Sequence, residues 1–293
     1  MKKVSLSDRA VYFGFTIVPV ALYSVFYVFQ VLGGMFYSLT DWNGMAKTYA
    51  IIGLKNYAWL ARNPNFWRSL GTTFRYSALL VILTIALSLM LALTLDSLKK
   101  RVQTLAKSIF FIPAMLSAVT VALIWSQIYY RAIPVIGEAF NIGVLKASPL
   151  ADPNPTLFAT VFVNVWQSVA IPSLIFIAGL QSIPRELHES AMIDGASILQ
   201  RFCYISFPHL MPTMVVNLVL LVKNGFTTFD YPYALTQGGP ARATEVIAIS
   251  IVNDAFRDYR FSIANAEAVI LFMIIASISF VQIWLTSKGD AYK

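Results

Sequence analysis

The sequence predicts an all-α membrane protein with six transmembrane helices, both termini in the cytoplasm and a cytoplasmic helix–turn–helix hairpin. Only 12% of the 293 residues are charged and the mean hydropathy is +0.68, whereas soluble domains carry about 25% charged residues. Six windows of at least 20 residues contain no Asp, Glu, Lys or Arg. Basic residues are also denser in alternate connecting segments, which gives the chain a preferred orientation.

Each charge-free window is long enough to be a transmembrane helix, which needs about 20 apolar residues to cross the hydrocarbon core. A soluble helical protein fits poorly, because its helices normally keep one charged face. We expect a single transmembrane domain over residues 1–293, with the hairpin at 184–206. The expected spans are about 11–38, 73–95, 106–130, 157–181, 208–230 and 264–286.

The N-terminus combines Lys2 and Lys3 with an apolar run, as secretory signals also do. The run is longer than the apolar core of a signal and no small-x-small cleavage site follows it, so we interpret it as a retained first span. With this end inside, the inside segments carry 11 basic residues in 55 positions and the outside segments 9 in 86. The bias, strongest at Lys99-Lys100-Arg101, predicts cytoplasmic termini.

The predicted outside segments contain turn signals rather than a water-soluble domain. These signals lie at 41–44, 62–65, 148–155 and 236–240. Before the sixth span, apolar residues recur four positions apart at Ile247, Ile251, Ala255 and Tyr259. This spacing predicts a helix at the outer surface or against the outer ends of the spans.

The motifs of common enzymes are absent from the sequence. It has no GxxxxGK[ST] phosphate loop, no HExxH pair and no nucleophile elbow. Cys203 is the single cysteine and there are two histidines, so neither an internal disulfide nor a metal cluster is expected. The net charge of +8 is spread over short loops beside the spans, which indicates membrane topology rather than nucleic-acid binding.

The polar stretch between the fourth and fifth spans predicts two short helices around a turn. Pro184 suits the first turn of a helix that runs from Arg185 to Asp194, and Gly195 suits its left-handed end. Ser197 and Gln200 have the spacing of a capping box, so a second short helix should begin near Ser197.

Two readings of this hairpin follow from the residues alone. In the first, Glu189 and Asp194 meet basic residues of a partner protein that approaches the small turn at Gly195 and Ala196. In the second, the hairpin is an amphipathic connector at the membrane surface. Local physics leaves both open.

The order of motifs along the chain resembles ABC-importer permeases. ESAMIDGA at 189–196, followed by Ile205 and Pro208, is similar to their cytoplasmic EAA loop, and Asp194-Gly195-Ala196 resembles the maltose-type and glycerol-phosphate-type sugar permeases. The likeness includes SLTDW, GLKNY, QSIP and FDYPYALTQGGPARAT at 38–42, 53–57, 181–184 and 229–244. The chain departs from the pattern at Ser190, Phe207 and Gln237, where alanine, leucine and glycine are common.

The resemblance implies a type I importer fold and a division of labour among several proteins. The hairpin would dock into a separate ATPase subunit, so the chain itself would be no enzyme and hold no cofactor, with ATP and Mg bound by that partner. The implied partners are two ATP-binding subunits, a homologous second permease forming a heterodimer, and an extracytoplasmic solute-binding protein. The implied docking residues are Glu189, Ala191, Asp194, Gly195, Ala196, Ile205 and Pro208.

Polar and aromatic residues in the fourth and fifth spans are candidates for the solute path. Amides and aromatic faces suit sugars, which present hydroxyl edges and apolar C–H faces. The same residue types also gather at membrane interfaces and hold helices together. The candidates are Asn164, Trp166, Gln167, Asn217, Lys223, Asn224, Phe226 and Phe229.

Lys223 has two interpretations of its own. It lies 15 residues after Pro208, about 23 Å along a helix and hence in the outer half of the bilayer. Its charge can snorkel outward or pair with Asp230, or it can line a cavity that attracts an anionic solute.

The function expected from this resemblance is the plasma-membrane permease subunit of an ATP-driven importer that translocates a sugar, in particular an oligosaccharide. A permease for glycerol phosphate or another polyol or sugar derivative is the alternative within the family. A self-contained secondary transporter is the rival from another class, but it is expected to carry midplane ionisable groups and inverted repeats. The chain offers little of either, apart from Lys223.

Overall fold

Helices are the main secondary structure of the part described by the computed structural model, which covers residues 6–290, with side chains from residue 13 to residue 284. Within this range the β pairing is a single isolated bridge between Thr40 and Ile51. The predicted all-α class is therefore confirmed. The chain forms two compact units: residues up to 63 with 251–272, and residues 64–250 with those from 273 onward.

The first unit contains the N-terminal helices and the start of the last helix. Its elements are α1 (Leu6–Tyr23), a π-helical turn (Ser24–Val28), α2 (Phe29–Tyr37), α3 (Lys55–Arg62), a π-helical turn (Asn253–Arg257) and the first part of α15 (Phe261–Asp290). Buried Asn56 donates hydrogen bonds of 2.8 Å to the carbonyls of Ser38 and Thr40. Arg260 pairs with Asp254 at 2.6 Å and lies over the Trp59 ring. These bonds fold the connections of this unit into a fixed structure.

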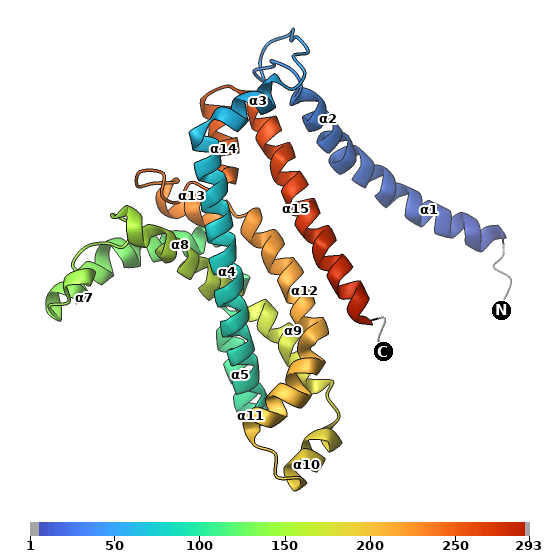
Figure 1. Cartoon of the computed structure of the whole chain (residues 1–293), viewed down its shortest axis with the longest axis vertical. Helices are drawn as coiled ribbons and strands as arrows, with labels where there is room; N and C mark the ends of the chain where they lie inside the picture. Colours follow the sequence, from blue (N-terminus) through green and yellow to red (C-terminus); the bar gives the residue numbers. More distant parts are fainter. Residues whose placement is uncertain (1–5, 291–293) are drawn as a thin grey trace. The chain divides into compact units, whose positions relative to one another are not determined.

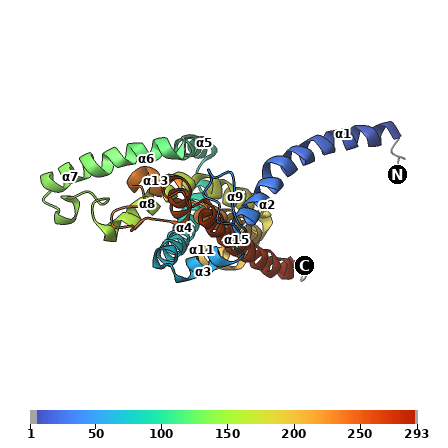
Figure 2. The same ribbon diagram turned by 90° about the horizontal axis from the view of Figure 1, so that it is seen from above.

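The second unit is built around α4, which packs against α8, α9 and α12 (Figure 1). Its helices are α4 (Pro64–Asp96), α5 (Lys100–Phe111), α6 (Ala118–Gln127), α7 (Ile133–Ala139), α8 (Pro153–Ser168), α9 (Ala170–Gln181), α10 (Arg185–Ile193), α11 (Ile198–Arg201), α12 (Phe207–Phe226), α13 (Asp230–Thr236), most of α14 (Ile247–Val252) and the second part of α15. Helix α6 lies against α8 and α13 (Figure 2). Buried apolar clusters along α4 centre on Tyr76 and Leu80 at one end and on Ala92 and Leu95 at the other.

Five described helical segments are long and apolar enough to cross a membrane, and six if one bent pair is a single span. The five are Phe13–Tyr37, Pro64–Asp96, Ala118–Ala139, Ile198–Phe226 and Phe261–Trp284. The bent pair is Pro153–Ser168 with Ala170–Gln181, at 46°. The upper count agrees with the six expected spans.

The third span differs from the one that the sequence predicts. Residues 106–130 were expected as one helix, but α5 ends at Phe111 and the apolar segment long enough to span is Ala118–Ala139. The break is at Pro113, which has no N–H to donate and begins a separate 3₁₀ turn. Proline at position 172 similarly accounts for the bend between α8 and α9, because its ring crowds the carbonyl of Ser168.

The helix expected before the sixth span is present but shorter than its spacing suggested. It runs from Ile247 through the π-helical turn and ends at Arg257. Tyr259, expected on the same face, lies beyond it with a φ of +53°. Lys2 and Lys3 of the basic N-terminus lie outside the described residues.

Candidate functional site

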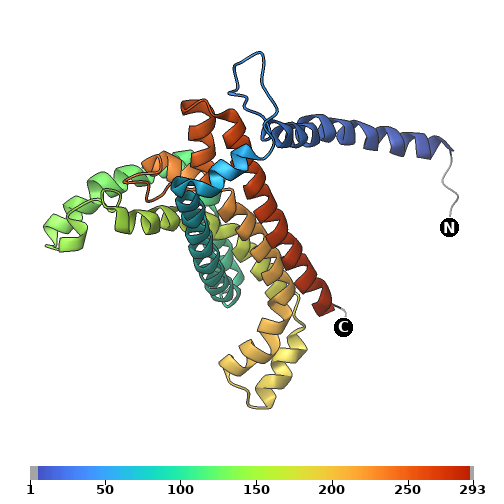
Figure 3. The ribbon, with the colours of Figure 1, turned by 45° about the horizontal axis from the view of Figure 1, so that its top comes forward.

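The hairpin between α9 and α12 is the first candidate site, and it protrudes from one end of the second unit (Figure 3). Its first arm, α10, runs from Arg185 to Ile193, with Pro184 at the N-cap rather than inside the first turn. The Ala196 N–H donates to the Ala191 carbonyl at 2.9 Å. Gly195 has a φ of +80°, the left-handed conformation that the sequence predicted for the end of this helix.

The second arm begins at the predicted capping box. The Ser197 N–H donates to Oε1 of Gln200 at 2.8 Å, and the Gln200 N–H donates to Oγ of Ser197 at 3.3 Å. These reciprocal bonds satisfy backbone donors that the start of a helix otherwise leaves without partners. The turn is therefore fixed by bonds within the hairpin itself.

The sequence predicts that the second arm ends before the fifth span begins. The structure differs from this prediction. Helical structure is continuous from Ile198 to Phe226, through a π-helical segment at Phe202–Ser206 and into α12. Pro208 lies in the first turn of α12. A π segment shifts the hydrogen-bond register by one residue, which lets the helix pass a proline without breaking. The hairpin is thus joined rigidly to a transmembrane helix.

Four large apolar side chains around the turn are exposed, and we name them the hairpin apolar surface. Their exposed fractions are 88% for Ile193, 79% for Ile198, 71% for Leu199 and 81% for Tyr204. Because apolar area of this kind is normally covered, this surface is suited to contact with a protein or with lipid. None of these four residues is among the docking residues expected from the sequence, although apolar residues on both sides of a polar turn are a visible signal.

The docking residues expected from the resemblance are distributed over the same hairpin. Glu189, Asp194, Gly195 and Pro208 are exposed, and the remaining three, Ala191, Ala196 and Ile205, are half-buried. A methyl group added at Gly195 would meet no atom within 4 Å, so backbone conformation rather than space favours glycine there.

The second candidate site is a set of buried polar residues between helices of the second unit, which we call the polar seam. It consists of Tyr76, Asn164, Gln167, Asn217 and Tyr231. Asn164 is fully buried, donates to the Tyr76 hydroxyl at 3.1 Å and accepts from the Ser168 hydroxyl at 2.8 Å. This contact joins α8 to α4.

Gln167 uses both ends of its amide within the seam. Nε2 donates to the Leu116 carbonyl at 2.7 Å, and Oε1 accepts from the Tyr231 hydroxyl at 2.7 Å. Burial, helped by the charge of Asp230, raises the pKa of Tyr231 to about 12, so its hydroxyl keeps the proton that it donates. Leu116 lies in the segment where the expected third span is broken, and Gln167 ties that segment to α8.

Asn217 joins α12 to the bend between α8 and α9. It is fully buried and donates to the Pro172 carbonyl at 3.2 Å. Together with Asn164 and Gln167, it is one of three expected path residues whose amide nitrogens are used in bonds between helices. These bonds hold helices together, which is the alternative to solute contact that such residues have in a membrane protein.

The other expected path residues lie elsewhere on the second unit. Trp166 is 41% exposed, and Lys223 and Asn224 are exposed on α12. Phe226 is buried with its ring edge-to-face against Phe74, at a centroid distance of 4.9 Å. Phe229 is half-buried and stacks on Tyr233 at 4.7 Å.

Lys223 does not form the ion pair considered for it. Among the described residues, no salt bridge joins it to Asp230. A charged side chain exposed on a helix of spanning length is costly against lipid, so Lys223 suits a water-filled cavity, the membrane interface or a protein partner. In the described part of the chain, no group of three or more His, Cys, Asp or Glu residues could hold a metal ion.

Comparison with known proteins agrees with this architecture. The family model of the binding-protein-dependent transport system inner membrane component matches residues 84–287. The multiple sugar-binding transport system permease protein MsmF of Streptococcus mutans is 38% identical, over 95% of this chain and 97% of its own. The sn-glycerol-3-phosphate transport system permease protein UgpA of Brucella abortus is 28% identical over the full length of both chains.

A solved structure has the same fold. It belongs to a bacterial ABC transporter involved in the import of the acidic polysaccharide alginate, with a TM-score of 0.81 and 20% identity over 96% of both chains. The match to the family model covers more than half of the sequence, including the hairpin and the polar helices beside it. The chain is a multi-pass membrane protein and belongs to the family of binding-protein-dependent transport system inner membrane components.

Proposed function

We propose that the chain is the permease subunit of an ATP-driven importer that carries a sugar, in particular an oligosaccharide, across the plasma membrane. The observation that carries this proposal is the continuous helix from Ile198 to Phe226, which joins the exposed hairpin to a helix of spanning length. Movement of the hairpin by a docked partner would move that helix as a lever. MsmF, whose name describes a multiple sugar-binding transport system, supports a sugar as the cargo.

The partners follow from this arrangement. Two ATP-binding subunits would hold ATP and Mg, and one of them would receive this hairpin through Glu189 and the hairpin apolar surface. A homologous second permease would complete the path as a heterodimer, and an extracytoplasmic binding protein would deliver the solute. The hairpin and both termini would then lie in the cytoplasm, in agreement with the basic cluster at Lys99-Lys100-Arg101.

The energy of the cycle sets a requirement on the docking contact. Shifting a two-state transporter from 1:99 to 99:1 needs about 5.5 kcal/mol of differential binding. The chain has no phosphate loop of its own, so closure of the ATP-binding subunits would supply this energy through the hairpin. A turn fixed by a capping box and joined to a spanning helix would transmit such a movement with little loss to local bending.

The solute path, in this proposal, uses the expected residues that are exposed: Trp166, Lys223 and Asn224. The residues of the polar seam would instead set the positions of the helices that carry them. Lys223 would attract anionic groups of the solute, so Lys223→Met should weaken uptake of an anionic sugar more than that of a neutral one. Unchanged uptake of both would exclude this role.

The alternative within the family is a permease for glycerol phosphate or another polyol or sugar derivative, which UgpA supports through its name. A self-contained secondary transporter is the less favoured class, because the exposed hairpin would then have no partner to cover its apolar residues. Identifying the ligand of the cognate binding protein would decide between a neutral sugar and a phosphorylated solute.

The test of the function is uptake by the complete transporter reconstituted with its ATP-binding subunits, second permease and binding protein. We expect Glu189→Lys and Gly195→Asp each to abolish ATP-dependent uptake while the chain still reaches the membrane. Glu186→Lys is the matched control, because it reverses a charge on the same exposed helix and should leave uptake largely intact. Normal transport by both hairpin variants would overturn the proposal.

The single cysteine gives a direct test of orientation. Cys203 is exposed on the second arm of the hairpin. A membrane-impermeant maleimide should label it in inverted vesicles and not in intact cells whose outer surface is accessible to the reagent. The reverse pattern would contradict a cytoplasmic hairpin.

A further inference from the structure

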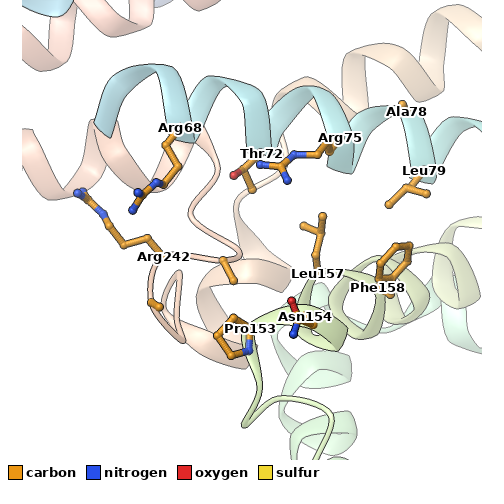
Figure 4. A pocket seen from close by; sticks show the side chains of 12 residues that line it. Arg68, Thr72, Arg75, Ala78, Leu79, Pro153, Asn154, Leu157, Phe158 and Arg242 are labelled. Carbon is orange, nitrogen blue, oxygen red and sulfur yellow. The ribbon is translucent and has the colours of Figure 1, made fainter. Parts of the chain in front are cut away.

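A cavity of about 660 Å³ opens in the second unit, and no residue of the hairpin or of the polar seam lines it (Figure 4). Helix α4 forms one wall, and the start of α8 and the loop at 241–243 form the others. The residues that line it are Arg68, Thr72, Arg75, Ala78, Leu79, Pro153, Asn154, Leu157, Phe158, Ala241, Arg242 and Ala243. Three of these are arginines and none is acidic.

One of the three arginines is neutralised beside the cavity, and its loop is held in place. Arg242 forms a two-pronged ion pair with buried Glu245, at 2.5 Å from Nε to Oε2 and 2.7 Å from Nη2 to Oε1. The Ser69 hydroxyl of α4 also donates to Glu245, at 3.2 Å. The Ile247 N–H donates to the Thr73 hydroxyl at 2.8 Å, which ties the segment that follows the loop to the same helix.

Arg68 and Arg75 leave the cavity with excess positive charge. Both are exposed, and among the described residues no carboxylate lies within ion-pair distance of either. Nε of Arg75 donates to the Gly71 carbonyl at 3.3 Å, which positions the side chain along its own helix. The planar guanidinium groups offer paired N–H donors that match the oxygens of a phosphate or a carboxylate.

The polarity of the cavity changes along α4. Arg68, Thr72 and Arg75 are followed by Ala78 and Leu79, and the charge-free run of this helix begins at Tyr76. Figure 4 shows Arg68 and Arg242 at one end and Leu79 and Phe158 at the other. Phe158 is 60% exposed. The arginines therefore lie just before the charge-free run of α4, the position at which we expect the helix to enter the hydrocarbon.

We propose that this cavity binds an anionic phospholipid, with the headgroup phosphate between Arg68 and Arg75 and an acyl chain against Leu79 and Phe158. A ligand with a charged end and an apolar end at this depth matches both the excess charge and the apolar floor. A free phosphate would satisfy only the arginines and leave the apolar end uncovered. An acidic surface of a protein would not reach the apolar end at membrane depth.

The test measures lipid binding to the full-length chain by native mass spectrometry in detergent, with dioleoyl phosphatidylglycerol and dioleoyl phosphatidylcholine as probes. We expect selective retention of phosphatidylglycerol. Because each basic residue near a membrane surface contributes about fivefold in affinity, the double variant Arg68→Gln/Arg75→Gln should bind it about 30-fold more weakly. Lys55→Gln/Arg62→Gln removes the same charge from α3, whose residues do not line the cavity, and should bind phosphatidylglycerol like the unchanged chain.

The outcomes separate the possible ligands. Equal retention of both lipids, or equal loss in the two double variants, would overturn the proposal. Displacement of phosphatidylglycerol by inorganic phosphate at similar concentration would show a simple anion site and also overturn it. The proposal would also be overturned if Arg68→Gln/Arg75→Gln lost binding to the cognate binding protein but bound phosphatidylglycerol as the unchanged chain does. The two arginines would then belong to a protein interface. Phe158→Gln, which alters the exposed apolar end, should weaken phosphatidylglycerol binding and leave the binding of inorganic phosphate unaffected.

Discussion

The hairpin and the polar seam are both polar interruptions of an apolar chain, yet their polar groups are satisfied in opposite ways. In the hairpin, Ser197 and Gln200 bond to each other three residues apart, and large apolar side chains such as Ile193 are left exposed. In the seam, Asn164 bonds to Tyr76 across 88 positions of the sequence, and both side chains are fully buried.

This difference separates a surface made for a partner from a contact made for the fold. A segment that completes its own hydrogen bonds can leave the body of the protein and expose apolar area for binding. A polar side chain whose bond crosses between helices fixes the distance between those helices, and its bonded atoms are no longer available to a ligand. Oδ1 of Asn217 differs, because it is buried without a hydrogen-bond partner among the described residues. Polarity in the sequence therefore does not by itself identify a solute path.

The largest effect is expected from charges placed on the hairpin apolar surface. We expect Ile193→Lys/Ile198→Glu to weaken binding of the ATP-binding subunit by about 100-fold or more, since central interface residues each contribute about 2 kcal/mol or more. Each charge suits the dipole of its own helix end, so folding should be unaffected. Affinity of the purified ATP-binding subunit for the detergent-solubilised chain measures the effect.

The matched control is Ile193→Leu/Ile198→Leu, which keeps the apolar area and should bind as the unchanged chain does. If the charged variant bound the ATP-binding subunit equally well, the hairpin apolar surface would not be the docking contact.

The next largest expected effect concerns α4 and α12, two helices that carry residues of the polar seam. A methyl group at Gly225 of α12 would lie 2.9 Å from the Ser77 backbone, whereas one at Gly71 of α4 would meet nothing within 4 Å. We expect Gly225→Val to lower the free energy of unfolding by about 1–3 kcal/mol through overpacking. Gly71→Val should change it much less. Unfolding in a titration with sodium dodecyl sulfate compares them, and equal midpoints would show that α4 and α12 are not in close contact.

The smallest expected effect tests one bond of the seam. Tyr231→Phe removes the hydroxyl that donates to Gln167, and hydrogen bonds between membrane helices average about 0.6 kcal/mol, with a maximum of about 1.7. Because burial raises the pKa of Tyr231 from 10.0 to about 12, the folded state favours the protonated hydroxyl. The contribution of the hydroxyl should be complete below pH 10 and be lost as pH rises to about 12.

The measurement is the unfolding midpoint of the unchanged chain minus that of Tyr231→Phe, taken from pH 7 upward. This subtraction removes the titration of the other tyrosines. A difference that stays constant from pH 10 to pH 12 would show that the pKa of Tyr231 is not raised in the folded state, and would place Tyr231 in a more exposed site than the seam.

Much of the hairpin could be predicted from the sequence because its geometry depends on neighbours a few residues apart. The left-handed Gly195 and the capping box at Ser197 and Gln200 are observed as predicted. The continuity of the second arm with α12 was not predicted, because Pro208 is normally read as a helix start and the π-helical segment that accommodates it has no sequence signature.

The seam could be predicted only as a list of residue types. Asn164, Gln167 and Asn217 were selected as polar residues in apolar helices, but their partners Tyr76, Leu116 and Pro172 were not. Those pairings depend on how helices pack, and the spacing of residues along one helix carries no information about the facing helix.

The apolar spans, the polar hairpin between the fourth and fifth of them, and the turn of the hairpin follow from the sequence alone, because hydrophobic period and local capping act over a few residues. Which polar side chains bond between helices, and which are exposed, depends on the packing of the folded chain. This packing also assembles the arginine-lined cavity from three segments, at 68–79, 153–158 and 241–243. Contacts between residues far apart in the sequence form when helices pack against one another. The spacing of residues along a single helix therefore does not predict them.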